Sequence, residues 1–183
     1  MKQIILNLAV SLDGFIEGPN GEIDWCIMEE DMHFDAFIDS IDTIFYGRVS
    51  YDAWGNFQPD ENTPPAEKIM WQGIHTKNKF VFSSQSRSDK KAEFIHSDIE
   101  NRIAAIKKQG GKDIWLYGGA NLIKSFIRLG LIDIYKISVH PVVLGSGKPL
   151  FEDLENRIKL ELTETRIFRS GVVELTYKLD GSA

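Results

Sequence analysis

A hydrophobic segment that runs through two glycines directly into an amphipathic helix restricts the fold of this chain more than any other feature. The strand pattern covers residues 112–117, the glycines are Gly118 and Gly119, and the helix pattern covers residues 119–129. A strand joined to a helix by so short a turn is typical of α/β proteins. Two residues without a Cβ also let a ligand approach the backbone, and a helix N-terminus attracts anions. The junction therefore predicts either a tight connection alone or a phosphate site.

Strand and helix patterns alternate through the first 130 residues. The aliphatic run over residues 4–10 predicts a strand that is buried on both faces. The patterns that follow predict a helix over 29–42, a strand over 43–47, a helix over 48–54, a loop over 57–65, a strand over 79–84, and a helix that starts with a capping box at 97–100 and ends at 110–111. This alternation predicts a mostly parallel sheet with right-handed crossovers.

The last 50 residues depart from the alternation. Strand patterns over residues 132–144, 158–168 and 172–179 have no helix between them, and a turn at 169–171 joins the last two. We therefore expect an α/β fold in which a mostly parallel central sheet carries helices on both faces and ends in an antiparallel β-hairpin. A chain of 183 residues with 43% hydrophobic residues suits one domain, which we expect to span residues 1–183.

Composition excludes several classes of function. A net charge of -6 and a pI near 5.2 argue against nucleic acid as a partner. No apolar run is long enough to span a membrane. Cys26 is the only cysteine, which rules out an intrachain disulfide and suits a cytoplasmic location. The four histidines have no metal-ligand spacing, so we expect no metal site.

Polar side chains follow three of the predicted strands. They are Gly47 and Arg48 with Ser50, then Ser83 with Ser84, and finally the Gly118–Gly119 pair. Ligands of open α/β sheets bind beyond the carboxyl ends of the strands, so these groups are expected to converge. An arginine beside hydroxyls suits a phosphate monoester. Each group alone is equally typical of a surface ion pair or a cap, but together they favour a phosphate ligand.

Two carboxylates and two aromatic residues are candidates for contact with a substrate. Asp13 lies just beyond the first strand, and Asp31 lies in the first turn of a predicted helix. The structural alternative for Asp13 is that it forms a turn before a glycine, and for Asp31 that the helix dipole favours a negative charge at the helix N-terminus. Trp25 and Phe34 are suited to stacking on a planar heterocycle, although aromatic residues among apolar neighbours more often belong to the core.

These motifs resemble the dihydrofolate reductase fold, and in particular the reductase domains of riboflavin biosynthesis. Residues 46–50 (Tyr-Gly-Arg-Val-Ser) are similar to the Gly-Arg-x-Thr segment that handles NADPH phosphates in dihydrofolate reductases. Residues 82–85 resemble the strand end whose serine meets the 2′-phosphate, and residues 117–121 resemble the Gly-Gly turn at the pyrophosphate and nicotinamide. Residues 11–14 and 140–145 are closer to the riboflavin-type branch. The likeness covers almost the whole chain.

The resemblance implies an NADPH-dependent reductase, a small-molecule substrate and a homodimer. The implied cofactor-binding residues are Gly47, Arg48, Ser50, Ser83, Ser84, Gly118, Gly119, Ala120 and Asn121. Together with the residues named above, the expected substrate-binding residues are Asp13, Trp25, Phe34 and Tyr117, and Asp13 and Asp31 are the candidates for the proton-donating catalytic carboxylate.

The substrate is left open by one departure from the family pattern. Tyr117 stands where riboflavin-type reductases carry a substrate-contacting glutamate directly before the glycine pair. The resemblance as a whole favours a reductase similar to 5-amino-6-(5-phosphoribosylamino)uracil reductase, while Tyr117 leaves the exact substrate open. A dihydrofolate reductase acting on a pterin and a non-catalytic NADP(H)-binding protein are the alternatives, and an enzyme of sugar nucleotides or phosphates ranks last.

Overall fold

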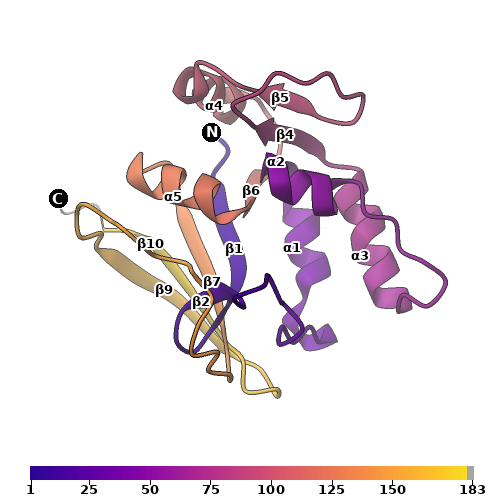
Figure 1. The fold of residues 1–183 in the computed structure, drawn as a ribbon, viewed down its shortest axis with the longest axis vertical. Helices are drawn as coiled ribbons and strands as arrows, with labels where there is room; N and C mark the ends of the chain where they lie inside the picture. The colour runs from indigo at the N-terminus through magenta and orange to yellow at the C-terminus, as the bar shows by residue number, and fades with distance from the viewer. Residues whose placement is uncertain (181–183) are drawn as a thin grey trace. The chain divides into compact units, whose positions relative to one another are not determined.

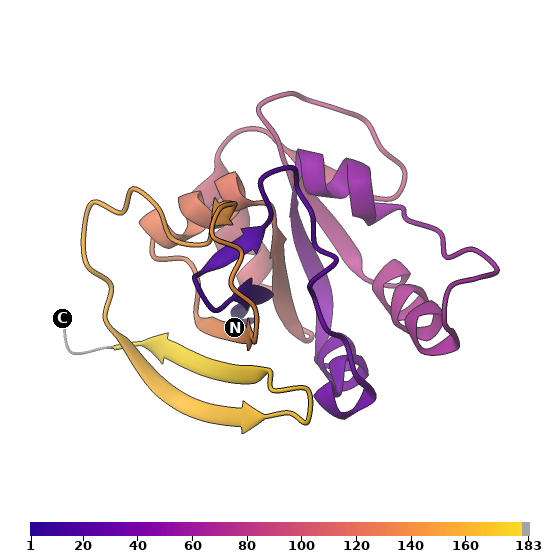
Figure 2. The same ribbon diagram turned by 60° about the horizontal axis from the view of Figure 1, so that its bottom comes forward.

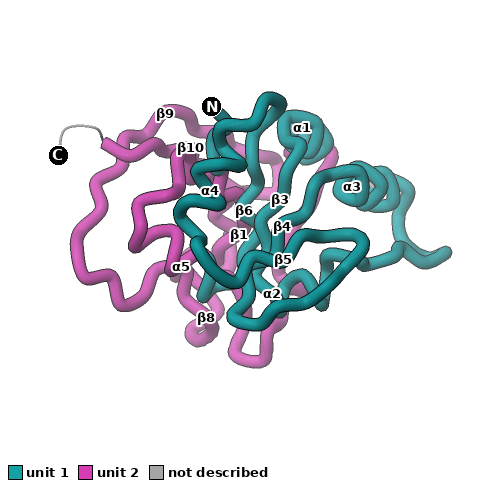
Figure 3. The backbone as a smooth tube through the Cα atoms, turned by 90° about the horizontal axis from the view of Figure 1, so that it is seen from above, with its two compact units in different colours: residues 1–4, 33–122 teal, residues 5–32, 123–183 magenta. Residues whose placement is uncertain are grey.

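The computed structural model describes residues 1–180. Contacts within the chain define two compact units, which Figure 3 shows in different colours. Unit 1 consists of residues 1–4 and 33–122, and unit 2 consists of residues 5–32 with the described part of 123–183.

Unit 1 is built on four parallel strands (Figure 1). Their order is β5-β4-β3-β6, with bounds β3 Ile41–Gly47, β4 Asn78–Phe82, β5 Glu93–Ile95 and β6 Asp113–Gly118. The middle strand β3 is almost continuously buried, as expected for a parallel sheet that is covered on both faces. The register places Gly47 beside Phe82 and Tyr46 beside Gly118, so the three carboxyl ends lie at one edge.

The helices of unit 1 are α1 Phe34–Ser40, α2 Arg48–Ser50, the π-helical turn η2 Tyr51–Gly55, α3 Pro65–His75 and α4 Ile99–Lys108. Helix α3 begins with a proline at its first position, where the missing N–H has no intrahelical partner to lose. It contacts α1 and buries Trp71 and Ile74. Helix α4 buries Ile103 and Ile106 at three-residue spacing.

Unit 2 combines one parallel strand pair with an antiparallel hairpin. Strand β1 Ile4–Ser11, whose first residue belongs to unit 1, runs parallel to β7 Ile134–His140. Strand β10 Val173–Leu179 pairs antiparallel with both β7 and β9 Leu160–Ile167. Figure 2 shows this hairpin at the yellow end of the chain. The short strands β2 Phe15–Glu17 and β8 Lys148–Pro149 pair separately, the turn η1 covers Glu30–Met32, and α5 Ala120–Arg128 begins in unit 1 and continues into unit 2.

The structure confirms the α/β class, the mostly parallel pairing and the C-terminal hairpin, but it corrects two predicted helices and the predicted capping box of a third. The helix expected over 29–42 is reduced to η1 and α1, because Ile41 and Asp42 begin β3. The helix expected over 48–54 is divided between α2 and η2. The capping box at 97–100 does not form, since Asp98 is the N-cap, adopts a left-handed conformation and makes no side-chain cap bond. Helix α3 was not predicted at all.

None of the helices within residues 1–180 combines the length and the apolar character needed to cross a bilayer.

A buried ion pair ties the N-terminus of unit 1 to β3. Lys2, with 3% of its side chain exposed, pairs with Asp42 and donates to the Thr43 hydroxyl at 3.1 Å. Asp42 also accepts hydrogen bonds from the Thr43 hydroxyl at 2.7 Å and from the Lys112 backbone N–H at 2.8 Å. Partial burial acts to raise the pKa of Asp42, but the hydrogen bonds from Lys2, Thr43 and Lys112 outweigh it and lower that pKa.

We expect Asp42→Ala to lower the free energy of unfolding by about 2–3 kcal/mol at neutral pH, because the Lys2 ammonium loses its buried carboxylate partner. A pKa that is lower in the folded state gives stability that is present above the unfolded pKa of about 3.9 and is lost as the pH falls through the folded pKa. Urea unfolding should therefore show the gap between wild type and variant closing below about pH 4. The exposed Asp39→Ala is the control, and equal losses for both variants would contradict the assignment.

Candidate functional site

The glycine ends of β3 and β6 meet backbone to backbone in unit 1. A Cβ added to Gly47 would lie 3.2 Å from the Gly119 nitrogen and 3.4 Å from the Gly118 oxygen. Gly118 has a φ of 117°, which residues with a side chain rarely adopt, and the Gly118–Gly119 peptide is cis. Residues with a side chain would not fit at Gly47 or Gly118, where the ends of β3 and β6 meet.

A hydroxyl and a helix N-terminus complete this junction. The Ser50 hydroxyl oxygen would lie 2.9 Å from a Cβ added to Gly119. Helix α5 begins at Ala120, directly after the glycine pair, so the positive end of its dipole lies at the junction. The structure therefore brings together the predicted residues Gly47, Ser50, Gly118 and Gly119 with the first residues of α5, Ala120 and Asn121.

Two arginines share one carboxylate beside Ser50. Arg48 binds Asp52 at 3.1 Å, and Arg87 binds the other oxygen of Asp52 at 2.6 Å and Asp89 at 3.2 Å. The Arg87 guanidinium also lies 5.9 Å from the ring centre of Tyr51. Both guanidiniums are about half exposed and therefore accessible to an anion. Sequence reasoning missed Arg87, although an arginine close behind Ser83 and Ser84 is the same signal that selected Arg48.

Ser83 and Ser84 follow β4 at the same edge. The Ser83 N–H donates to the Ile95 oxygen at 3.1 Å, and its hydroxyl accepts the Gln85 N–H at 3.0 Å. These bonds give Ser83 a role in the turn. Ser84 is exposed, which leaves its hydroxyl as the more accessible of the two.

An aromatic cluster lies beneath the glycine pair in unit 1. The Tyr117 ring centre lies 4.8 Å from that of Tyr46 and 4.9 Å from that of Trp115, which in turn contacts Phe34 at 5.6 Å. Burial raises the pKa of Tyr117, and burial together with the neighbouring tyrosines raises the pKa of Tyr46, so both phenols are neutral at physiological pH. The fully buried Tyr46 hydroxyl has no hydrogen-bond partner among the described residues. Phe34 is partly exposed and belongs to this cluster.

Asp13 joins two loops of unit 2. Its carboxylate accepts hydrogen bonds from the Ser11 hydroxyl at 2.7 Å, the Leu144 N–H at 3.1 Å and the Gly145 N–H at 2.8 Å. The hydrogen bond from Ser11, assisted by those from Gly145 and Leu144, lowers the pKa of Asp13 despite a contribution from burial that raises it. A carboxylate that is held ionised in this way is suited to holding loops together and unsuited to donating a proton near neutral pH.

Asp31, also in unit 2, differs in its hydrogen bonding. It lies in η1, and its buried Oδ1 atom has no hydrogen-bond partner within the part of the chain that the structure describes. A buried acceptor without a donor is costly unless a ligand supplies one. Of the predicted carboxylates, Asp31 is therefore the better candidate for contact with a substrate.

Trp25, another predicted substrate residue, lies in unit 2. It packs edge-on against His140 with ring centres 5.5 Å apart, and its indole N–H donates to the backbone oxygen of Glu22 at 3.2 Å.

Similarity to solved structures defines the fold class as dihydrofolate reductase-like. The dihydrofolate reductase of Enterococcus faecalis, solved with NADP(H), aligns over 97% of this chain and 96% of its own with a TM-score of 0.66 and 16% identity. A putative riboflavin biosynthesis protein from Shewanella sp. PV-4 aligns over 98% and 99% of the two chains with a TM-score of 0.79 and 24% identity.

Within that class, the chain belongs to the RibD C-terminal domain family, whose model matches residues 2–174. The family is one of NAD(P)H-dependent reductases. Two uncharacterized proteins of Bacillus subtilis are relatives by sequence. YyaP is 54% identical over 98% of this chain and 96% of its own, and YwjB is 35% identical over 93% and 95%.

Proposed function

We propose that the protein is an NADPH-dependent reductase of the riboflavin type that reduces a small nitrogen-containing or carbonyl substrate. The observation that carries the proposal is the meeting of Gly47 with Gly118 and Gly119 beside the Ser50 hydroxyl. A side chain at Gly47 would meet the backbone of Gly118 and Gly119, and one at Gly119 would meet the Ser50 hydroxyl, so the glycines keep the two strand ends in close contact. The backbone N–H groups at the N-terminus of α5, directly after this contact, are suited to a pyrophosphate. The residues present therefore fit the cofactor that the family implies.

Each part of the proposed cofactor site has a physical role. Gly118, Gly119 and Ala120 allow close approach, and the N-terminus of α5 offsets the charge of the pyrophosphate. Arg48 and Arg87, with Ser50 and Ser84, supply charge and hydroxyl donors for a 2′-phosphate. NADPH, when bound, supplies the hydride, and the protein orients the reactants and excludes water.

For the substrate, we propose a heterocycle that donates hydrogen bonds from its ring or amino N–H groups. The unpartnered Oδ1 of Asp31 is suited to accept such a bond. A solved Thermotoga maritima protein with this fold (TM-score 0.68, 14% identity, alignment over 98% of this chain and 57% of its own) is described as a deaminase and 5-amino-6-(5-phosphoribosylamino)uracil reductase. An aminouracil of that kind is our leading substrate class, and a pterin also fits the free carboxylate oxygen.

Binding and turnover test the proposal in sequence. We expect NADPH to quench tryptophan fluorescence and to raise the melting temperature, because it binds only the folded state. NADPH consumption is then followed with an aminouracil ribose phosphate and with a dihydropterin, and turnover is expected with one of them. Absence of both quenching and thermal stabilisation would contradict cofactor binding. Binding without turnover on either substrate would instead support a non-catalytic NADP(H)-binding protein.

Two further features belong to the proposal. The single cysteine favours a cytoplasmic location, because a reducing compartment needs no disulfide. A homodimer is the assembly that we propose.

A further inference from the structure

His140 is a buried histidine at the end of a strand in unit 2. It is the last residue of β7, lies opposite Ser11 of β1, and is only 2% exposed. Just beyond the two strands, the Leu12 N–H donates to the Val142 oxygen at 2.8 Å and joins the segments that follow them. The imidazole therefore lies on a well-braced part of the sheet. The proposed cofactor and substrate contacts do not include it.

Both ring nitrogens of His140 face backbone carbonyl oxygens. Nδ1 lies 3.0 Å from the Ser138 oxygen on the same strand, and Nε2 lies 3.2 Å from the Ile27 oxygen, 113 residues earlier in the chain. Carbonyl oxygens only accept hydrogen bonds, so each bond forms when that ring nitrogen carries a proton. The ring also packs edge-on against Trp25, with ring centres 5.5 Å apart. His140 thus contacts two residues of one distant segment.

That segment, residues 23–29, has few other attachments. It forms no helix or strand, and Ile23 and Met28 are 44% and 61% exposed. Its other hydrogen bonds in the described chain stay within residues 22–32. The bond from Nε2 of His140 is therefore the hydrogen bond that joins the segment to the sheet.

The segment leads directly into Asp31. The turn η1 follows it, and the buried Oδ1 atom of Asp31 lacks a hydrogen-bond partner in the described chain. A carboxylate oxygen without a donor turns toward water unless the backbone around it is held in place. The bond at Ile27, shortly before Asp31, supplies such a restraint.

We propose that His140 is a positioning residue for the substrate. Its Nε2–H holds the Ile27 oxygen, and the segment anchored in this way keeps Asp31 where an N–H group of the substrate can reach the free oxygen. The inference rests on the proposed role of Asp31 in substrate binding. The anchor itself can be measured without turnover.

Two amide side chains at position 140 distinguish the two hydrogen bonds of the ring. Glutamine places its amide nitrogen near the position of Nε2 and can still donate to Ile27. Asparagine places its amide nitrogen near the position of Nδ1 and can donate only to Ser138. His140→Gln should therefore keep the anchor, and His140→Asn should lose it.

Thiol labelling measures the anchor, because the chain's only cysteine, Cys26, lies within the segment. Cys26 is exposed as a residue, but partial burial of its thiol, together with Asp24, raises the pKa to about 11 and slows reaction with a disulfide reagent. At pH 8, we expect His140→Asn to react about five- to tenfold faster than wild type, because a released segment exposes the thiol. His140→Gln should react at close to the wild-type rate. An unchanged rate in His140→Asn, or equally fast reaction of both variants, overturns the anchor.

Kinetics measure the positioning role. With the aminouracil ribose phosphate or the dihydropterin, whichever the wild type reduces, the KM for that substrate should rise about tenfold in His140→Asn and much less in His140→Gln. The dissociation constant of NADPH should not change, because the proposed cofactor contacts do not include this segment. Faster labelling with an unchanged KM overturns the positioning role. If the wild type reduces neither substrate, the proposed function fails, and labelling still decides the anchor.

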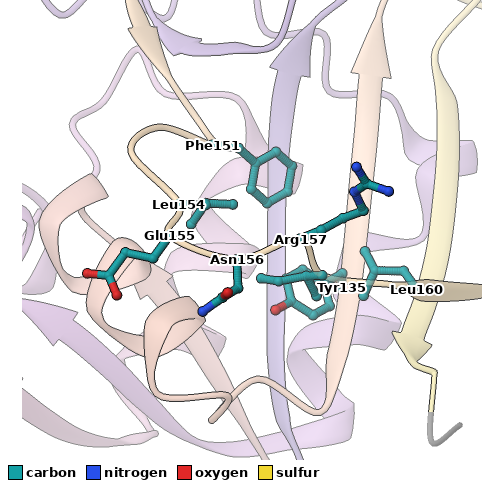
Figure 4. A pocket seen from close by; sticks show the side chains of 8 residues that line it. Tyr135, Phe151, Leu154, Glu155, Asn156, Arg157 and Leu160 are labelled. Atoms are coloured by element: carbon teal, nitrogen blue, oxygen red, sulfur yellow. The ribbon is translucent and has the colours of Figure 1, made fainter. Parts of the chain in front are cut away.

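Two controls separate this effect from a general disturbance. Leu154→Ala changes unit 2 near the other end of β7, where Leu154 lines a hollow of about 510 Å³ together with Tyr135 and Phe151 (Figure 4). His96→Asn replaces an exposed histidine of unit 1. Both variants should match the wild type in labelling rate and KM, and melting curves show whether each variant is folded. A rise in KM for Leu154→Ala as large as that for His140→Asn overturns the specific role of His140.

Discussion

Replacing Gly119 with alanine is expected to weaken NADPH binding about ten- to a hundredfold while the protein stays folded. The added methyl would lie 2.9 Å from the Ser50 hydroxyl oxygen, at the point where the ends of β3 and β6 meet. The hydroxyl is the end of a flexible side chain and can rotate away, so the fold tolerates the change. The displaced Ser50 hydroxyl belongs to the proposed cofactor site, so NADPH is expected to bind more weakly.

The matched control for this variant is Gly110→Ala. A Cβ added to Gly110 meets nothing within 4 Å, and Gly110 follows α4, away from the proposed site residues. Fluorescence titration with NADPH gives the dissociation constant of each variant, and thermal unfolding without ligand shows whether the fold is intact. If both alanine variants bind NADPH as tightly as the wild type, the glycine pair is only a tight connection between strand and helix.

The elements that the sequence predicted correctly are those whose burial alone determines their pattern. Strand β1 is an aliphatic run interrupted by Asn7 over residues 4–10, and four consecutive residues from Ile4 are buried. Helix α5 keeps its apolar residues on one face and buries Ile123, Phe126 and Ile127. The C-terminal hairpin follows from strand patterns that have no helix between them. In each case local spacing and tertiary burial agree.

The helices that were wrong or missed depend on competition between neighbouring elements. Ile41 continues the helical spacing of Phe34 and Phe37, but it is fully buried as the first residue of β3. Residues whose spacing fits a helix are therefore part of the sheet instead. Pro64 and Pro65 give the start of α3 the composition of a loop, although proline is well suited to the first turn of a helix.

Roles within the site were less accessible from sequence, because they depend on distant partners. Asp13 and Asp31 are both carboxylates near turns. Asp13 accepts hydrogen bonds from Leu144 and Gly145, more than 130 residues away, whereas Asp31 keeps a buried oxygen without a donor in the described chain. No local pattern encodes that difference. Arg87 likewise gains significance only because the fold brings it to Asp52, 35 residues earlier.

The pair Arg48 and Arg87 gives the largest expected change in cofactor preference. In the double variant Arg48→Ala/Arg87→Ala, the preference for NADPH over NADH should fall on the order of a hundredfold or more. In each single variant, this preference should fall by a smaller factor. Charge-assisted hydrogen bonds to phosphate are stronger than hydrogen bonds between neutral groups, and NADH has no 2′-phosphate that could form them. NADH binding itself should change little. Arg102→Ala is the control, because Arg102 is a similarly exposed arginine in an ion pair with Glu93.

Asp52 allows the same assignment to be tested in the opposite direction. Its carboxylate now binds both guanidiniums and therefore competes with a phosphate for them. Asp52→Asn keeps the shape of the side chain and removes that competition, so NADPH should bind more tightly while NADH is unaffected. Dissociation constants for both cofactors, measured at two salt concentrations, separate this effect from general surface charge. If the NADPH to NADH ratio is unchanged in the double arginine variant and in Asp52→Asn, the arginine pair does not contact the 2′-phosphate and only stabilises the turn after β4.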